Sequence, residues 1–303
     1  MNTLKKRAPR WKREQKKRVK EKKKSSVYIG LGFIFSLLFL VIFSFLWQRA
    51  RDSVWDGSGN FGVVVLREDE VEISVLQPST KRIVRFLVPL NTMVQAPFGF
   101  GEYQLGYIYK LGKLEDEGGR LLMRTVENNF AVSISGFKAL GNSNLTWWDS
   151  LRVGWFGAVG SSSKTLIDLL SLQTFDNSSL ADGTSVFRIK TIYMDELINH
   201  ELFDEKLLHE EFEIGVINSS EGAGVASNVS RIIRNIGGDV TLVSNSDSSE
   251  VSRIQVKNSD ILKSYTVEVL SRTFDVSRVE VVENSQFRAD VVVIIGKDYL
   301  SLK

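Results

Sequence analysis

Apolar and polar residues follow three different patterns along this chain of 303 residues. A segment without any charged side chain runs from Val27 to Trp47. Short runs of alternating or β-branched residues come next, separated by helical patterns with a period near 3.6. From Phe212 onwards, strand-like and helix-like runs alternate regularly. These patterns predict one membrane-length helix followed by two folded regions of mixed strands and helices.

The apolar segment Val27–Trp47 is long enough to cross a membrane. At a rise of about 1.5 Å per residue, it spans the roughly 30 Å hydrocarbon core of a bilayer. The apolar part of a cleavable signal peptide has only about 7–15 residues and is followed by small residues. This segment instead leads into Gln48 and Arg49. We therefore predict a retained, single-pass transmembrane helix over residues 27–47.

The residues before this segment are strongly basic. The first 24 residues contain 13 basic and 2 acidic side chains and carry a charge of +11, so the other residues carry −8 of the net +3. Cytoplasmic flanks of membrane helices are enriched in Lys and Arg. We therefore expect residues 1–26 in the cytoplasm, the remaining chain on the outer side of the cytoplasmic membrane, and contacts between the tail and anionic lipid. A working role for the tail itself stays open, but the acidic folded part gives no reason to expect a nucleic acid partner.

Between the connector 48–60 and residue 193, the pattern predicts a sheet with helices. Alternating residues indicate three paired strands, and apolar residues on one face indicate a clear helix near residue 120. An acidic helical linker is expected over 194–211. The expected elements are the strands Phe61–Leu66, Val71–Leu76, Arg82–Val88 and Thr184–Lys190 and the helices Glu102–Leu111 and Gly119–Asn129.

The last region, residues 212–303, repeats a strand-helix-strand pattern. The run VVVII at Val291–Ile295 is apolar throughout, which is typical of a strand buried on both faces. The fold class that we predict is α+β with α/β-like units: a transmembrane helix and two exported mixed domains. The other expected elements here are the strands Phe212–Asn218, Asp239–Asn245, Ile254–Asn258 and Arg278–Asn284 and the helices Val225–Gly237 and Asp260–Phe274.

Residue types with reactive side chains are scarce. The chain has no cysteine, which excludes disulfides, thiol nucleophiles and cysteine metal ligands. Its two histidines, His200 and His209, lie in the acidic linker, where a metal site is one interpretation and a solvated helix face the favoured one. The run Gly160–Lys164 lacks the glycine spacing of a phosphate loop. We expect no cofactor and no metal.

Aromatic residues gather within Thr146–Leu172. Trp147, Trp148, Trp155 and Phe156 suggest a surface that stacks on carbohydrate or faces a membrane. Buried anchors are the more common role of such residues, and we favour that interpretation.

The C-terminal region carries a recognisable motif within Leu202–Val240 and the closing Ala289–Tyr299. The motif residues are Val216, Ile217, Asn218, Ser219, Gly222, Gly224, Val225, Ala226, Gly237 and Gly238. With these residues, the region resembles the LytR C-terminal domain of LytR-CpsA-Psr cell-envelope proteins. The turn between the first strand and its helix allows a tight connection, or offers a helix N-terminus to an anionic ligand.

The middle region is similar to the catalytic domain of the same family, over Gln77–Gln95 and Gly118–Phe137. The resemblance implies transfer of anionic glycopolymers from polyprenyl-diphosphate carriers to peptidoglycan, with arginines on the diphosphate and carboxylates on magnesium. This chain has Gln77 in place of the family's acidic residue, and Leu90 and Asn91 in place of its Arg-Asp pair.

These departures favour a non-catalytic relative that binds or organises a cell-wall polymer, such as peptidoglycan, or envelope proteins. The alternative is an active glycopolymer phosphotransferase whose arginines come from Arg82, Arg85, Arg120 or Arg124. The candidate ligand-binding residues are Asn218, Ser219, Gly222, Gly224, Arg85, Arg120 and Arg124.

Overall fold

The computed structural model describes residues 53–247, 249, 251–283 and 287–301, together with seven positions between Ser36 and Ser44. Contacts divide the chain into two compact units, Met1–Ser53 and Val54–Lys303. The tail 1–26 lies outside the described residues, as does the predicted membrane helix 27–47 apart from those seven positions. No helix within the described ranges has the length and apolar character needed to span a membrane.

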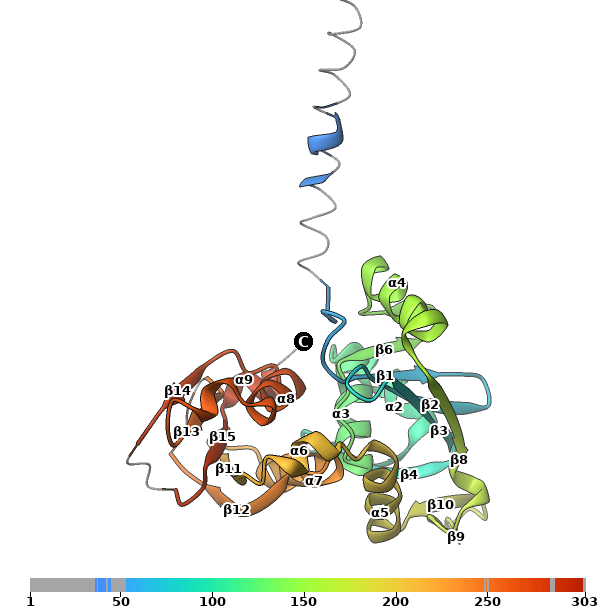
Figure 1. The fold of residues 1–303 in the computed structure, drawn as a ribbon. Helices are drawn as coiled ribbons and strands as arrows, with labels where there is room; N and C mark the ends of the chain where they lie inside the picture. Colours follow the sequence, from blue (N-terminus) through green and yellow to red (C-terminus); the bar gives the residue numbers. More distant parts are fainter. Residues whose placement is uncertain are drawn as a thin grey trace, which may run out of the picture. The chain divides into compact units, whose positions relative to one another are not determined.

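A six-stranded sheet forms the first half of the unit Val54–Lys303 (Figure 1). Strands β1, β2 and β3 pair antiparallel, as their alternation predicts, while β6 pairs parallel to β1 and β8 parallel to β3. The order is β7-β6-β1-β2-β3-β8. The bounds are β1 Phe61–Leu66, β2 Glu70–Gln77, β3 Arg82–Pro89, β6 Gly136–Ala139, β7 Asn142–Ser143 and β8 Ser163–Asp168.

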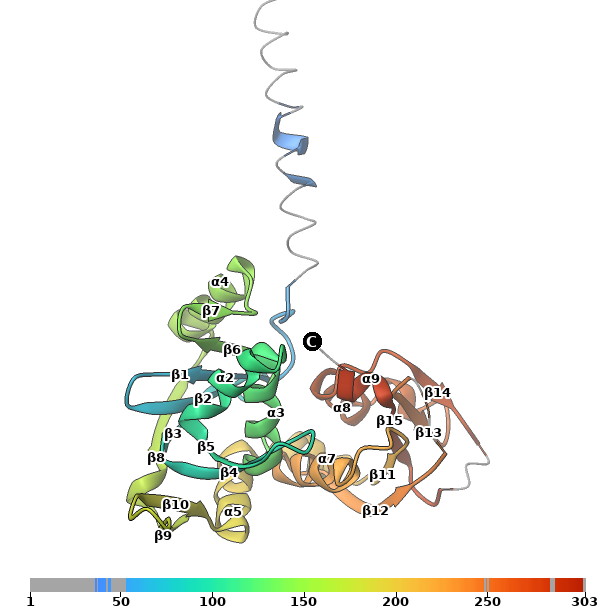
Figure 2. The ribbon, with the colours of Figure 1, turned by 180° about the vertical axis from the view of Figure 1, so that it is seen from behind.

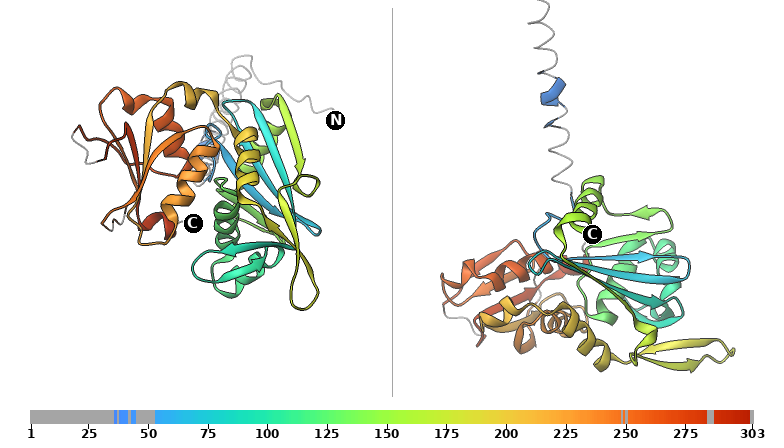
Figure 3. Two further views of the ribbon diagram at one scale, coloured as in Figure 1. Left: turned by 90° about the horizontal axis from the view of Figure 1, so that it is seen from below. Right: turned by 45° about the vertical axis from the view of Figure 1, so that its right-hand side comes forward.

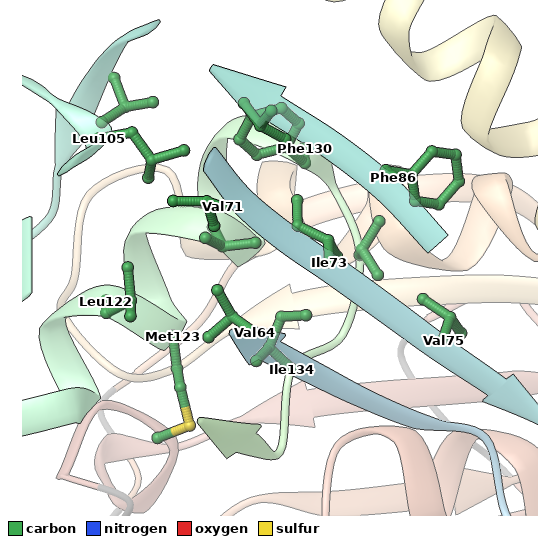
Figure 4. Packing of buried hydrophobic residues seen from close by; sticks show 14 of the residues in the cluster. Val64, Val71, Ile73, Val75, Phe86, Leu105, Leu122, Met123, Phe130 and Ile134 are labelled. Atoms are coloured by element: carbon green, nitrogen blue, oxygen red, sulfur yellow. The ribbon is translucent and has the colours of Figure 1, made fainter. Parts of the chain in front are cut away.

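Two helices, α2 (Leu105–Leu114) and α3 (Gly118–Phe130), pack on this sheet. Apolar residues spaced three and four apart give α3 one apolar face, and this face is fully buried. Figure 4 shows Leu122, Met123 and Phe130 against Val64, Val71 and Ile73 from β1 and β2. The predicted helix near residue 120 is therefore confirmed, and it forms the centre of the largest core.

A second sheet of four strands has the order β5-β4-β10-β9. Its β10 confirms a predicted strand. The helix expected from Glu102 was wrong at its start, because Gly101–Gln104 pairs with β4 and the helix begins only at Leu105. Strands β4, β8 and β9 were not predicted. The bounds are β4 Thr92–Ala96, β5 Gly101–Gln104, β9 Phe175–Ser179 and β10 Ser185–Ile189, with a short 3₁₀ turn η2 at Leu169–Ser171.

The aromatic segment forms α4 (Trp147–Trp155), which continues as the π-helical turn η1 (Phe156–Gly160). Phe156 is buried, but Trp147 and Trp155 are 65% and 68% exposed. The favoured prediction of buried anchors was therefore wrong for these two tryptophans. The physical reason is that the opposite side of the helix faces the protein: Phe156 packs on the sheet, and the carboxylate of Asp149 binds the backbone at Trp55.

The acidic linker forms two short helices, α5 (Thr191–Leu202) and α6 (Glu205–His209). Their apolar residues belong to the largest core, with Met194 and Ile198 almost fully buried. The helical character predicted for residues 194–211 is confirmed, and one face of α5 packs into the core.

The C-terminal part contains a five-stranded sheet in the order β12-β11-β15-β13-β14. All five residues of β15 (Val291–Ile295) are buried between β11 and β13, as the uninterrupted apolar run predicts. Helix α7 packs against β11 and β12 (Figure 3). The other bounds are β11 Glu213–Asn218, α7 Val225–Asn235, β12 Asp239–Asn245, β13 Arg253–Val256, η3 Ile261–Lys263, α8 Tyr265–Thr273, β14 Val279–Val281 and α9 Lys297–Ser301. The fold is mixed α/β with several sheets, as predicted.

Replacing Asp149 tests what holds α4 in place. The carboxylate is fully buried and accepts hydrogen bonds from the backbone N–H groups of Val54, Trp55 and Thr146 and from the Thr146 hydroxyl. An amide turns one acceptor into a donor and leaves buried N–H groups unpaired. Asp149→Asn should therefore lower the free energy of unfolding by about 1–3 kcal/mol.

Thermal and chemical unfolding of the full-length chain would measure this loss. The matched control is Asp247→Asn, because Asp247 is exposed; a change within about 0.5 kcal/mol is expected there. Equal losses in the two variants would show that Asp149 does not hold the helix.

Candidate functional site

The described residues enclose a cleft of about 540 Å³ between the first half of the unit and its C-terminal part. One side comes from the loop between β4 and β5 and from α3. The other comes from the turn before α7 and from α9. The lining residues are Gln95, Pro97, Phe98, Gly99, Arg124, Asn128, Asn129, Gly222, Ala223, Val225, Asn228, Tyr299 and Leu300. The fold thus brings together two predicted site residues, Arg124 and Gly222, that are far apart in the sequence.

Arg124 lines this cleft, and neighbouring groups compensate its charge. Its Nη1 donates to Glu127 Oε2 at 2.6 Å, its Nη2 donates to the carbonyl of Tyr299 at 2.5 Å, and the guanidinium lies 4.1 Å from the centre of the Tyr299 ring. Burial alone would lower the pKa of Arg124, but the charge of Glu127 and its hydrogen bonds outweigh this and raise the pKa above its ordinary value. Arg124 is therefore a permanent cation that joins α3 to α9.

The turn before α7 is built by its own side chains. Asn218 donates from Nδ2 to the carbonyl of Gly222 at 2.8 Å and accepts from the Ser220 N–H and hydroxyl. Asn218 and Ser219 are buried, and the Ser219 N–H donates to the carbonyl of Ile295. Gly224 has a φ of +75°, which disfavours any side chain there. Gly222 reaches the cleft, whereas Asn218 and Ser219 are not among its lining residues.

The other predicted arginines do not line the cleft. Arg85 lies on β3 with its Nε 4.0 Å from Glu72 Oε1. Arg120 pairs with Glu117 and lies 5.8 Å from the centre of the Phe98 ring. Arg82, which the transferase alternative also requires, donates to the carbonyl of Phe203. The four arginines therefore have separate partners, and ligand binding by any predicted site residue stays a prediction.

Neither histidine lies in a metal-binding cluster. The described ranges contain no group of three or more His, Asp or Glu side chains placed to hold a metal ion. His200 is 81% exposed and contacts Glu201. The favoured interpretation, a solvated helix face, agrees with this exposure.

Several cleft residues were missed by the sequence interpretation. Gln95 and Asn128 carry uncharged amides, and Phe98 is 45% exposed in a left-handed conformation with a φ of 62°. Uncharged amide and aromatic residues have no spacing along the chain that reveals a site. The one available signal in the sequence was Pro97-Phe98-Gly99, a pattern that is typical of a turn and that carries an aromatic residue.

The comparisons with known proteins concern solved structures. No family model and no curated protein sequence matches the chain. TagT of Bacillus subtilis is similar over 47% of this chain and 89% of its own, with 14% identity and a TM-score of 0.39. A TagT structure of the LytR-CPS2A-Psr family with bound octaprenyl pyrophosphate lipid gives the same coverage and identity, with a TM-score of 0.38. Bacillus subtilis TagV shares 10% identity over 46% of this chain and 94% of its own, with a TM-score of 0.37.

Replacing Arg124 tests whether it joins the two sides of the cleft. Arg124→Met leaves Glu127 buried without its cation, so the free energy of unfolding should fall by about 3 kcal/mol. The double variant Arg124→Met/Glu127→Gln should recover part of this loss. The matched control, Arg188→Met, breaks an exposed pair with Glu102 and should cost at most about 1 kcal/mol. A loss no greater than that of the control would contradict the role given to Arg124.

The carboxylate of Glu72, which lies beside Arg85, should make the stability of the fold depend on pH. Burial would raise the pKa of Glu72, but hydrogen bonds from Ser74 and Arg67 and the charges of Arg67 and Arg85 outweigh it and hold the pKa below its ordinary 4.5. A lowered pKa in the folded state stabilises the protein above pH 4.5, and this contribution is lost as the pH falls through the folded value.

Glu72→Gln should therefore lower the free energy of unfolding by about 1–3 kcal/mol at pH 7. The difference from the parent chain should shrink as the pH falls below 4.5. Denaturant unfolding over a pH series measures it, with the exposed Glu68→Gln as control. A difference that is constant with pH would rule out this role of the charge.

Proposed function

We propose that this chain is a membrane-anchored protein of the cell envelope that binds a cell-wall polymer and does not transfer it. The anchor rests on the apolar segment 27–47 and the basic tail, and the envelope assignment on the resemblance in the motifs. The cleft between the β4–β5 loop and the turn before α7 is the observation that carries the binding proposal. In the same proposal, the C-terminal part is a LytR C-terminal domain.

The lining of the cleft suits a polymer of sugars or anionic repeating units. Phe98 offers an aromatic face, and the amides of Gln95, Asn128 and Asn228 offer donors and acceptors for hydroxyl groups. The N-terminus of α7 adds positive potential. An open cleft with neutral hydrogen-bonding groups favours recognition without covalent chemistry.

The residues at the departures from the family pattern support binding over transfer. Gln77 is fully buried and donates to the carbonyl of Leu202, and Leu90 packs against the largest core. Asn91 donates to the carbonyl of Ser185. These side chains serve packing and hydrogen bonding inside the fold, so they cannot take over the roles of a metal-binding carboxylate and a diphosphate-binding arginine.

The direct test is cosedimentation of the full-length chain with insoluble peptidoglycan that retains its attached anionic polymer. Phe98→Ala should weaken binding about fivefold, because it removes the exposed aromatic face of the cleft. The matched control is Tyr107→Ala on α2, which removes another exposed aromatic ring outside the cleft and should bind like the parent chain.

Three results would overturn the proposal. Recovery of the chain in the supernatant with every polymer preparation would remove the binding function. Magnesium-dependent cleavage of a polyprenyl-diphosphate substrate, lost on replacing Arg82, Arg85 or Arg120, would establish the transferase alternative. Capture of an envelope protein by the same cleft, with no polymer bound, would show that the partner is a protein and not a polymer.

A further inference from the structure

The segment formed by α4 and η1 exposes its apolar side. The exposed residues between Trp147 and Gly160 are spaced as one face of a helix, and none of them carries a charge. Surface helices normally expose polar residues and bury apolar ones. We call this face the α4 apolar face; its residues are Trp147, Ser150, Leu151, Gly154, Trp155, Ala158 and Val159.

The two charged side chains of the segment point to the body of the protein. Asp149 is fully buried, and its carboxylate accepts hydrogen bonds from the backbone N–H groups of Val54 and Trp55. Arg152 Nη1 donates to the carbonyl of Trp55. Phe156 packs edge-on against Trp55, 6.0 Å between ring centres. These contacts fix the orientation of the helix, so the α4 apolar face is held outward by the fold. In Figure 2, α4 lies beside β7 at the end of the six-stranded sheet.

The same contacts place this face near the start of the folded unit. The backbone N–H of Val54 donates a hydrogen bond to Asp149 in the first turn of α4. The apolar segment ends at Trp47, seven residues before Val54. Seven residues span at most ~25 Å when fully extended. A bilayer that holds residues 27–47 therefore lies within a short distance of α4, whatever path the connector takes.

We propose that the α4 apolar face docks into the interfacial layer of the membrane to which the chain is anchored. Tryptophan rings prefer this layer, and Leu151 and Val159 supply the aliphatic area that an interfacial helix inserts. The proposal rests on the anchor in the proposed function. It adds a second attachment that fixes the orientation of the folded unit at the bilayer.

Two other occupants fit the face less well. A sugar chain stacks on aromatic rings but also needs hydrogen-bonding groups beside them, and Ser150 is the one polar side chain on the face. A second copy of the chain would have to reach the face while both copies are anchored within ~25 Å of the bilayer. The membrane is the partner that the tether brings to this face in every molecule.

The test uses the absence of cysteine from the chain. Leu151→Cys and Val159→Cys variants of the full-length chain are labelled with an environment-sensitive fluorophore. They are reconstituted into phosphatidylethanolamine and phosphatidylglycerol vesicles with and without nitroxide-labelled acyl chains. The matched control is Leu114→Cys on α2, which is 82% exposed. Quenching by the nitroxide lipid should be at least twofold stronger at residues 151 and 159 than at residue 114.

Each other result overturns the docking proposal. Quenching equal to that of the control would leave the face in water. A blue-shifted label without lipid quenching, lost when the chain is diluted into more lipid, would assign the face to a second copy. A label that responds only to added soluble glycan would assign it to a polymer. Release of the parent chain from vesicles at alkaline pH would instead refute the anchor and the proposed function.

Discussion

The buried pair of Arg124 and Glu127 is the interaction on which the cleft depends. Glu127 also accepts the backbone N–H of Ile134, just past the left-handed residue Ala131 that ends α3. Arg124 continues the network to the carbonyl and ring of Tyr299 on α9. Each charge is acceptable in the interior only because the other is present. The network therefore holds α3, the connection after it and the C-terminal helix α9 in one arrangement, and the cleft opens beside it.

The same network explains why an arginine in a cleft is weak evidence for diphosphate chemistry. A catalytic arginine must exchange its partners for the phosphate oxygens, whereas Arg124 has a carboxylate, a carbonyl and an aromatic face already in contact. Arg85 and Arg120 also have their own carboxylates. The cleft also contains uncharged amides and an aromatic ring. Exposing these groups costs less free energy than exposing an unpaired charge, so they are the groups available to a ligand.

The α4 segment shows how one buried carboxylate determines the outer surface of a helix. Asp149 binds the beginning of the folded unit, and the helix therefore turns Trp147 and Trp155 outward. Residue types alone favoured burial of these rings, because aromatic residues in water-soluble folds are mostly buried. The orientation of a helix is decided by the partners of its polar residues as much as by its apolar ones.

Periodicity was sufficient for β1, β2, β3, α3, α7 and β15, whose apolar residues repeat with the period of their own element and need no distant partner to be recognised. It missed β4, β8 and β9, which are short and lack a clear apolar pattern; β4 and β8 take hydrogen bonds from strands far away in the sequence. For the site, the residue types predicted Arg124 and Gly222 as separate candidates. The tertiary structure brings the two residues into one cleft, together with the neutral residues around them, because α9 and the turn before α7 pack against α3. No local pattern in the chain encodes such a contact.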